Sequence, residues 1–225
     1  MMSASRAWVF DLDNTLYPAS SALYQVVGER MTAHIIREVG VDEARALELR
    51  EQYLHSHGAT VIGLAEIHGL DARSFLQDVH DVDYATLLAP DPELNQLIAR
   101  ISDRKIVFTN GGGGHALNAL SALGLKDHFD AIYDIEAVGL APKPTQRAYE
   151  RLIAAAQIEP KGSLFIEDTL RNLEPAHALG FTTVLVGPVH PGGHVAYVDH
   201  WAHDLKSFLR EALDGQSQTA LALGP

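Results

Sequence analysis

Residues 7–15, Ala-Trp-Val-Phe-Asp-Leu-Asp-Asn-Thr, begin with four apolar residues, which are followed by Asp11 and, two positions later, Asp13. The apolar part predicts a short buried strand over residues 7–10 that opens into a polar loop. Asp11 and Asp13 are two positions apart, so in an extended backbone their side chains point to the same side. Two carboxylates in one small site repel each other unless a cation such as Mg²⁺ lies between them or one carries a proton. The stretch therefore predicts an acidic site at the end of a central strand, with a turn-capping aspartate as the alternative.

Beyond about residue 93 the chain alternates between strand-like and helical segments. The predicted strands are Lys105–Thr109, Ala131–Ile135, Ser163–Glu167 and Thr182–Val186, and the predicted helices are at about 114–123, 144–157, 172–179 and 203–213. Alternation at this spacing is typical of a parallel sheet with helices on both faces. Together with the first strand, it predicts a doubly wound α/β fold, in which ligands bind at the carboxyl ends of the strands.

The segment between these parts has a different pattern. Apolar residues at three- and four-residue spacing predict helices at about 23–35, 43–56, 61–68 and 72–80. The turn-like Ala89-Pro90-Asp91-Pro92 closes this helical block, because prolines are poorly tolerated inside helices. We therefore expect two domains: an α/β core formed by residues 1–16 and 93–225, and an inserted helical cap formed by residues 17–92.

The composition limits the partners of the chain. Its 225 residues include 17 Lys and Arg against 29 Asp and Glu, a net charge of −12, and no cysteine. So acidic a chain repels nucleic acid polymers and anionic membranes, which favours a small-molecule partner. The absence of cysteine excludes disulfides, a thiolate nucleophile and Cys-ligated metals.

The N-terminus has no features of a signal peptide, because Asp11 and Asp13 interrupt its apolar stretch. No apolar run approaches the ~18 residues of a membrane span, so we expect a cytoplasmic protein. The sequence does not indicate an oligomeric state.

A second strand end carries groups suited to an anion. Thr109 and Asn110 precede four glycines, Gly111–Gly114, and His115. Glycine backbone at a helix N-terminus presents unpaired N–H groups that bind anions, and phosphate is the expected one, with a flexible loop as the alternative. The same turn loosely fits the dinucleotide fingerprint G-x-G-x-x-A, with Asp134 at a later strand end. His115 could contact a substrate or cap the helix, and is left unassigned.

Two further segments place charged residues at the same edge of the sheet. Lys143 lies between two prolines just before a helix, which restricts its backbone and fixes where its ammonium group points. The strand at 163–167 ends in Glu167 and is followed by Asp168. Acidic residues at two strand ends can meet to complete an oxygen-rich metal site, although Asp168 could instead be a helix N-cap.

Four segments, taken in order, resemble the four motifs of the haloacid dehalogenase (HAD) superfamily of phosphotransferases. They are V-F-D-L-D-N-T-L-Y-P at 9–18, F-T-N at 108–110, K-P at 143–144 and I-E-D-T-L-R-N at 166–172. Members of this superfamily carry a helical cap inserted just after the first motif. Within the insertion, Tyr53-x-x-x-x-Gly58-x-x-x-x-Gly63-Leu64-x-x-x-His68 is similar to the cap of the pyrimidine 5′-nucleotidase-like branch. The resemblance implies a Rossmann-like HAD core with such a cap.

The resemblance also implies roles for the residues at the strand ends. Asp11 would be the nucleophile that forms an aspartyl-phosphate, and Asp13 would be the general acid and then the base that activates water. Thr109 and the backbone N–H of Asn110 would hold the phosphoryl oxygens, while Lys143 would offset negative charge. Because dehalogenases of this superfamily lack the second aspartate, Asp13 favours a phosphatase.

The same resemblance implies a Mg²⁺ site. The ion would be held by Asp11, the backbone carbonyl of Asp13 and Asp168, with Glu167 or Asn172 acting through water. Asn172 is a departure from the family pattern, because some members carry another Asp there. This departure concerns the outer metal ligands and not the reaction.

We therefore expect a Mg²⁺-dependent phosphomonoester hydrolase, with pyrimidine nucleoside monophosphates as candidate substrates. Two alternatives stay open: a sugar-phosphate mutase on the same core, and a non-catalytic module that binds a dinucleotide at the glycine turn. The candidate specificity residues in the cap are Tyr17, Tyr53 and His57. Four histidines near the end show no metal-binding spacing and are expected at the surface: His190, His194, His200 and His203.

Overall fold

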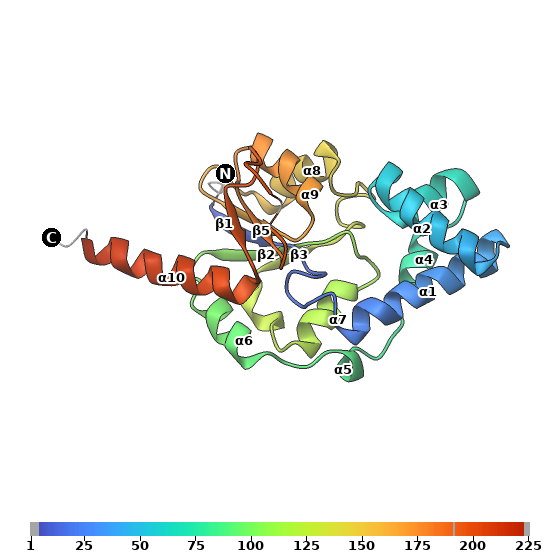
Figure 1. Cartoon of the computed structure of the whole chain (residues 1–225), viewed down its shortest axis with the longest axis horizontal. Helices are drawn as coiled ribbons and strands as arrows, with labels where there is room; N and C mark the ends of the chain where they lie inside the picture. The colour runs from blue at the N-terminus through green and yellow to red at the C-terminus, as the bar shows by residue number, and fades with distance from the viewer. Residues whose placement is uncertain (1–4, 191, 223–225) are drawn as a thin grey trace.

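A six-stranded sheet forms the centre of the computed structural model, which describes residues 5–190 and 192–222 (Figure 1). The strand order is β3-β2-β1-β4-β5-β6, and every neighbouring pair is parallel. The strands are β1 (Ala7–Phe10), β2 (Arg104–Phe108), β3 (Ala131–Tyr133), β4 (Leu164–Glu167), β5 (Thr182–Val186) and β6 (His200–Ala202). The predicted doubly wound parallel sheet is confirmed, with β1 between β2 and β4 at its centre.

Side chains of β1 alternate between the two faces of the sheet, as the geometry of a strand requires. Trp8 and Phe10 pack on one face, and Ala7 and Val9 pack on the other. The first face is covered by α6 (Pro92–Ala99), α7 (His115–Ala122) and α10 (Leu205–Ala222). The second face is covered by α8 (Gln146–Ala156) and α9 (Leu170–Ala178). Because both faces are buried, the strand has to be apolar at every position.

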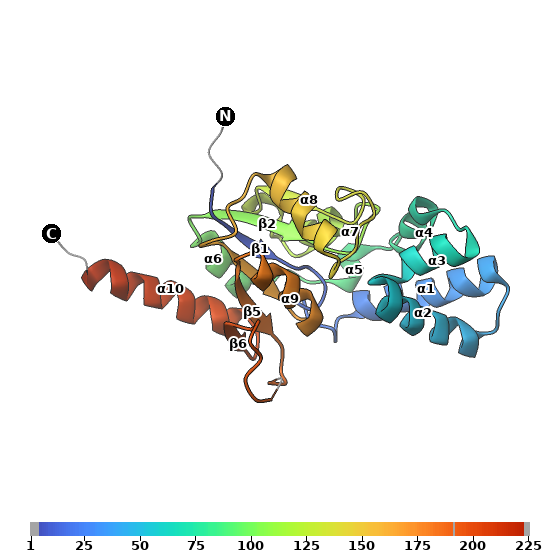
Figure 2. The same ribbon diagram turned by 90° about the horizontal axis from the view of Figure 1, so that it is seen from above.

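Four helices make up the cap, which lies at one end of the molecule (Figure 2). They are α1 (Ala22–Val39), α2 (Glu43–His57), α3 (Thr60–His68) and α4 (Ala72–Val79). Ser21, Asp42 and Asp71 cap the starts of α1, α2 and α4 by accepting hydrogen bonds from backbone N–H groups. The cap has its own apolar cluster, drawn mainly from residues 35–79. The cap helices therefore pack around a core separate from the two cores that cover the sheet.

Some elements differ from those expected. α5 (Tyr84–Leu87), α6, the 3₁₀ turn at Lys126–His128 and β6 were not predicted. α5 falls within the expected cap, but Tyr84 and Leu88 pack with the apolar cluster of the α/β core. The connection after α4 therefore already belongs to the core packing.

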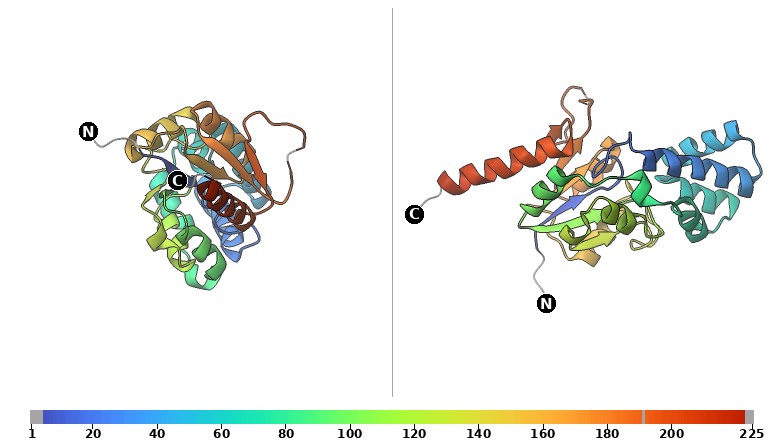
Figure 3. Two further views of the ribbon diagram at one scale, coloured as in Figure 1. Left: turned by 90° about the vertical axis from the view of Figure 1, so that its left-hand side faces the viewer. Right: turned by 90° about the horizontal axis from the view of Figure 1, so that it is seen from below.

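The last helix, α10, runs away from the sheet on the side opposite the cap (Figure 3). It extends further than the predicted helix at 203–213, from Leu205 to Ala222. In the part of the chain that the structure describes, no helix combines the length and apolar character needed to cross a membrane.

Candidate active site

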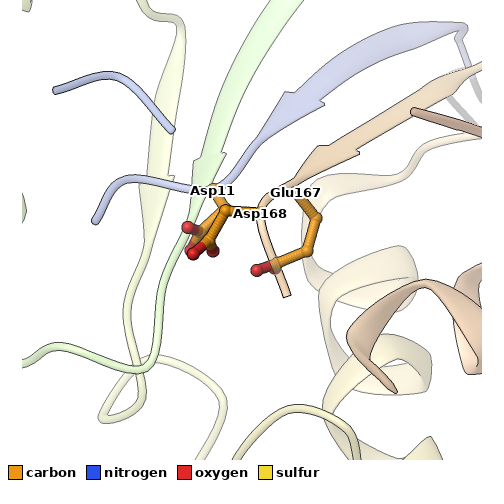
Figure 4. A group of neighbouring side chains, drawn as sticks. All are labelled: Asp11, Glu167 and Asp168. Carbon is orange, nitrogen blue, oxygen red and sulfur yellow. The ribbon is translucent and has the colours of Figure 1, made fainter. Parts of the chain in front are cut away.

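Three carboxylates meet at the carboxyl ends of β1 and β4 (Figure 4). Asp11 follows β1 directly, Glu167 is the last residue of β4, and Asp168 follows it. One oxygen atom from each lies within 4.8 Å of the others. The backbone N–H of Asp11 donates to the carbonyl of Ile166 at 2.9 Å, which holds the two strand ends in register. The predicted meeting of acidic residues from two strand ends is therefore observed.

Lys143 lies between two members of this acidic group, Asp11 and Glu167. It is only 1% exposed, and its Nζ lies 2.6 Å from Asp11, 2.7 Å from Glu167 and 2.9 Å from the carbonyl of Phe108. Burial by itself disfavours the ammonium form, but the two carboxylates outweigh it and raise the pKa of Lys143 above its usual value. The lysine therefore stays charged, and it uses all three of its donors.

Negative charge still exceeds positive charge in this group. Burial, together with repulsion from Glu167, raises the pKa of Asp11 to about 7 despite the contact with Lys143. Burial also raises the pKa of Glu167 to about 7; Lys143 opposes this shift and Asp168 adds to it. The buried Oδ1 of Asn172 has no hydrogen-bond partner within the described residues. Clustered carboxylate oxygens with too little positive charge fit a hard divalent cation such as Mg²⁺, which Asp11, Asp168 and Glu167 could hold.

The side chain of Asp13 takes part in a different set of contacts. It accepts hydrogen bonds from the hydroxyl of Tyr17, from His115 Nε2 at 2.8 Å and from Thr109 Oγ1 at 3.2 Å. Burial would raise the pKa of Asp13, but the charge of His115 and the hydrogen bonds from His115 and Tyr17 lower it below its ordinary range. Asp13 therefore rests as a carboxylate beside the acidic group.

His115, unassigned from the sequence, joins Asp13 to two residues that sequence reasoning missed. Its Nδ1 lies 2.8 Å from the hydroxyl of Tyr84, and its ring stacks on His80 at 4.3 Å between centroids. Burial and the neighbouring His115 lower the pKa of His80 to about 3, so His80 is neutral. The sequence carries no spacing signal for this group, because Tyr84 and His80 lie in a connection with no recognisable motif.

One backbone donor of the glycine turn, which was expected to bind phosphate, is already used within the chain. The N–H of Gly113 donates to Glu136 at 2.8 Å, so a carboxylate of the chain already occupies that donor. A Cβ on Gly113, whose φ is +62°, would lie 2.9 Å from the carbonyl of Leu76 in α4. With the cap helix packed this closely, the backbone at Gly113 is covered by protein, which disfavours the dinucleotide interpretation. Thr109 and Asn110, just before the glycines, remain at the edge of the acidic site.

The expected phosphate-binding residue Asn110 also connects the cap to the core. Its Oδ1 accepts from the backbone N–H of Lys143 at 2.8 Å, and its Nδ2 donates to the Lys143 carbonyl at 3.0 Å. The same Nδ2 lies 3.3 Å from the carbonyl of Gly58, at the end of α2. The side chain of Asn110 thus fixes the loop that carries Lys143.

The three candidate specificity residues do not line the cavity that reaches Asp13 between cap and core. This cavity has a volume of about 490 Å³ and is lined by Asp13, Asn110 and residues of α1 and α2. Tyr17 is buried against Asp13, and Tyr53 is buried inside the cap with its hydroxyl 2.7 Å from His68 Nε2. His57 packs edge-on against Tyr53. Aromatic type alone could not separate a substrate contact from a buried cap residue.

The four C-terminal histidines are all exposed, as expected. Within the described residues, the cluster of metal-ligating side chains is the acidic one at Asp11, Glu167 and Asp168. The histidines His190, His194, His200 and His203 take no part in it.

Comparison with known proteins places the chain in a family. The model of the haloacid dehalogenase-like hydrolases matches residues 6–180. Phosphate metabolism protein 8 of Saccharomyces cerevisiae is 27% identical over 200 residues; the match covers 81% of this chain and 61% of the yeast protein, so the chain spans less than two thirds of that relative. Two solved structures share the fold at 18% sequence identity. One is a HAD phosphatase from Thermococcus onnurineus, with a TM-score of 0.64; the match covers 94% of this chain and 97% of that chain. The other is the L-2-haloacid dehalogenase of Xanthobacter autotrophicus, with a TM-score of 0.59; the match covers 92% of this chain and 98% of that chain. The chain belongs to the haloacid dehalogenase-like hydrolases.

Proposed function

We propose that this hydrolase is a Mg²⁺-dependent phosphomonoesterase that works through an aspartyl-phosphate. The observation that carries the proposal is the contact of Asp11 with Lys143, beside Glu167 and Asp168, at the carboxyl ends of the central strands. A carboxylate held next to a buried ammonium suits attack on a phosphate group, because that reaction depends on positioning and charge stabilisation. The names of the yeast relative and of the Thermococcus phosphatase also support phosphate chemistry.

In the first step, a carboxylate oxygen of Asp11 forms a bond to phosphorus while the bond from phosphorus to the leaving oxygen breaks. Asp13 gives its proton to that leaving oxygen. Asp13 rests as a carboxylate, but a phosphate dianion placed beside it raises its pKa by like-charge repulsion and favours uptake of the proton. Lys143 balances the charge on Asp11 and the phosphoryl group.

In the second step, water attacks the phosphorus of the aspartyl-phosphate. The Asp13 carboxylate takes the proton from this water, the bond between Asp11 and phosphorus breaks, and inorganic phosphate leaves. Thr109, whose hydroxyl lies 3.2 Å from Asp13, would contact a phosphoryl oxygen. Bound Mg²⁺ would neutralise charge on the phosphoryl oxygens.

Nucleoside monophosphates of the pyrimidine series are the proposed substrates. The cap sequence, residues 17–92, carries five Lys and Arg against twelve Asp and Glu, a net charge of −7. This charge disfavours a leaving group with further phosphates, so a monophosphate is preferred to a polyphosphate.

The test is phosphate release from p-nitrophenyl phosphate with and without Mg²⁺. Activity should require the ion and should fall by more than about a thousandfold in Asp11→Asn, because the nucleophile is lost. Asp127→Asn, a change at an exposed position, is the matched control and should keep full activity. Full activity in Asp11→Asn would remove the nucleophile from the proposal. Interconversion of phosphosugar isomers with little phosphate release would indicate a mutase instead.

A further inference from the structure

An arginine in the cap lies in the wall of the cavity that reaches Asp13. Arg50 is half-buried on α2, and its Nη1 donates to Thr32 Oγ1 at 2.7 Å. Within the described residues, no carboxylate forms an ion pair with its guanidinium, and burial lowers its pKa. A partly desolvated arginine without an anionic partner has donors free for a ligand.

The position of Arg50 is set by the neighbouring helix. Thr32 donates to the carbonyl of Gly28 at 3.1 Å, which leaves its oxygen to accept from Arg50. A Cβ on Gly28 would lie 3.1 Å from Arg50 Nη2, so glycine makes room for the guanidinium here. The two residues of α1 together hold the arginine fork against the cavity.

The cavity around Arg50 is bordered by apolar side chains that are exposed to solvent. Leu47 and Leu54 lie three residues before and four residues after Arg50 on α2, so all three share one face of the helix. Leu47 is 48% exposed, Leu54 44% and Tyr24 of α1 49%, and all three line the cavity. Large exposed apolar side chains gathered at one cavity indicate a binding surface. Their contacts suit a flat or apolar group and would leave the hydroxyls of a sugar without partners.

The charge around the cavity favours a neutral acceptor over a second anion. Asp13 and Glu51 line the same cavity as Arg50, and the cap sequence as a whole has a net charge of −7. A carbonyl oxygen accepts from the guanidinium fork without adding negative charge to these surroundings. The group that meets Arg50 is therefore best described as a ring with carbonyl oxygens.

We propose that Arg50 recognises the far end of the leaving group of the substrate, a flat ring whose carbonyl oxygens accept hydrogen bonds from the guanidinium. The phosphate lies at Asp13 and the ring extends between α1 and α2 to Arg50. This assignment rests on the proposed phosphomonoesterase activity, and it makes Arg50 a specificity residue of the cap.

The experiment compares two substrates that share the reacting centre, UMP and ribose 5-phosphate. Only UMP carries a flat base with carbonyl oxygens. Arg50→Met should lower kcat/KM for UMP by about 10- to 100-fold, mainly through KM, and change that for ribose 5-phosphate by less than about threefold. Arg50→Lys keeps the charge but loses the fork, and should show a smaller loss for UMP alone. Arg45→Met is the control, because Arg45 is exposed on the same helix, pairs with Glu48 and does not line the cavity.

Equal losses for both substrates, or no loss for either, would overturn the assignment. If Arg50→Met is inactive on both because it does not fold, Arg50→Lys decides by the same comparison. A further outcome is that the unchanged protein hydrolyses p-nitrophenyl phosphate but shows no preference for UMP over ribose 5-phosphate. That result would overturn the role of Arg50 and would still support the phosphomonoesterase activity. No phosphate release from any of the three esters would overturn the phosphomonoesterase itself.

Discussion

Lys143 is enclosed by protein, yet it carries a positive charge. Its ammonium group bridges Asp11 and Glu167, residues that end two neighbouring strands. Burying a charge is favourable only when partners replace the lost water, and here both carboxylates and a backbone carbonyl do so. One side chain thus serves both the packing of the sheet edge and the charge balance of the site.

Replacing this ammonium should cost stability. We expect Lys143→Met to lower the free energy of unfolding by about 3–5 kcal/mol at pH 8, because two buried carboxylates lose their cation. In the unchanged protein the pKa of both carboxyls is already about 7, above the unfolded value, and loss of the ammonium raises it further. Lowering the pH through this value protonates them in the folded state first, so the deficit should shrink between pH 8 and pH 6. Urea unfolding at the two pH values measures this, with the exposed Lys126→Met as control; an equal deficit at both pH values contradicts it.

A second residue-scale prediction concerns His115, which holds Asp13. Asparagine at this position cannot reach both Asp13 and Tyr84, so the general acid loses its alignment. We expect kcat/KM for an alkyl phosphate to fall by about tenfold or more in His115→Asn, while that for p-nitrophenyl phosphate changes little. The reason is that the nitrophenolate leaves without needing a proton, and kcat/KM reports the steps up to its departure.

The comparison of the two esters separates alignment of Asp13 from a general loss of structure. His55→Asn, at an exposed position of α2, is the control and should leave both values unchanged. Equal losses for the alkyl and nitrophenyl esters would show that His115 supports the fold and not the proton transfer.

At the scale of elements, the sequence predicted the strands and helices that have a strong apolar pattern. β5 runs from Thr182 to Val186 as predicted, because four of its five residues are buried. β6 has three residues, two of them exposed, and so has no apolar run to detect. α6 was not predicted from the sequence, because Pro92 was interpreted as part of a turn. In the structure Asp91 caps this helix and Pro92 begins it, a position that suits proline.

The packing of α3 on α2 gives a prediction for the cap. A Cβ on Gly63 would lie 2.3 Å from Cγ of Tyr53, so the two helices approach closely only because position 63 lacks a side chain. Gly63→Ala gains up to about 1 kcal/mol in helix propensity, but the clash should win and lower the free energy of unfolding by about 1–3 kcal/mol. Urea unfolding followed by circular dichroism measures the change.

Gly187→Ala is the matched control for this substitution. Among the described residues, a Cβ there meets nothing within 4 Å, and we expect a change within about 0.5 kcal/mol. A stability of Gly63→Ala equal to that of the unchanged protein would mean that Tyr53 can move aside without cost.

At the scale of the whole molecule, the sequence predicted where distant residues meet only when sheet geometry brings them together. Asp11, Lys143 and Asp168 come from segments far apart, and the common edge of a parallel sheet explains their meeting. The contact of His115 with Asp13 spans 102 residues and depends on how α7 begins after its glycine turn. No periodicity in the sequence encodes that orientation, so the contacts of His115 with Asp13 and Tyr84 could not be predicted.

Binding of Mg²⁺ should stabilise the entire chain. At about 100 times its Kd, the ion should add about 2.7 kcal/mol to the free energy of unfolding, a rise of about 5–10 °C in Tm. Asp168→Asn should lose most of this rise. Without the ion the same variant should melt higher than the unchanged protein, because burial and repulsion from Asp11 raise the pKa of Asp168 and disfavour its charge.

Thermal unfolding monitored with and without Mg²⁺ checks both effects without an activity assay. Asp127→Asn should keep the full rise. A rise of the same size in Asp168→Asn would place the ion elsewhere on the molecule.

The side chain of Asn110 touches Gly58 at the end of α2 and both backbone polar groups of Lys143. A swing of the cap that carries α2 away from the sheet has to break the first of these bonds, whereas the two shorter bonds to Lys143 stay within the core. Opening the cap to admit a molecule can therefore leave the lysine loop anchored, and the ammonium can keep its place beside the nucleophile while a substrate enters and a product leaves.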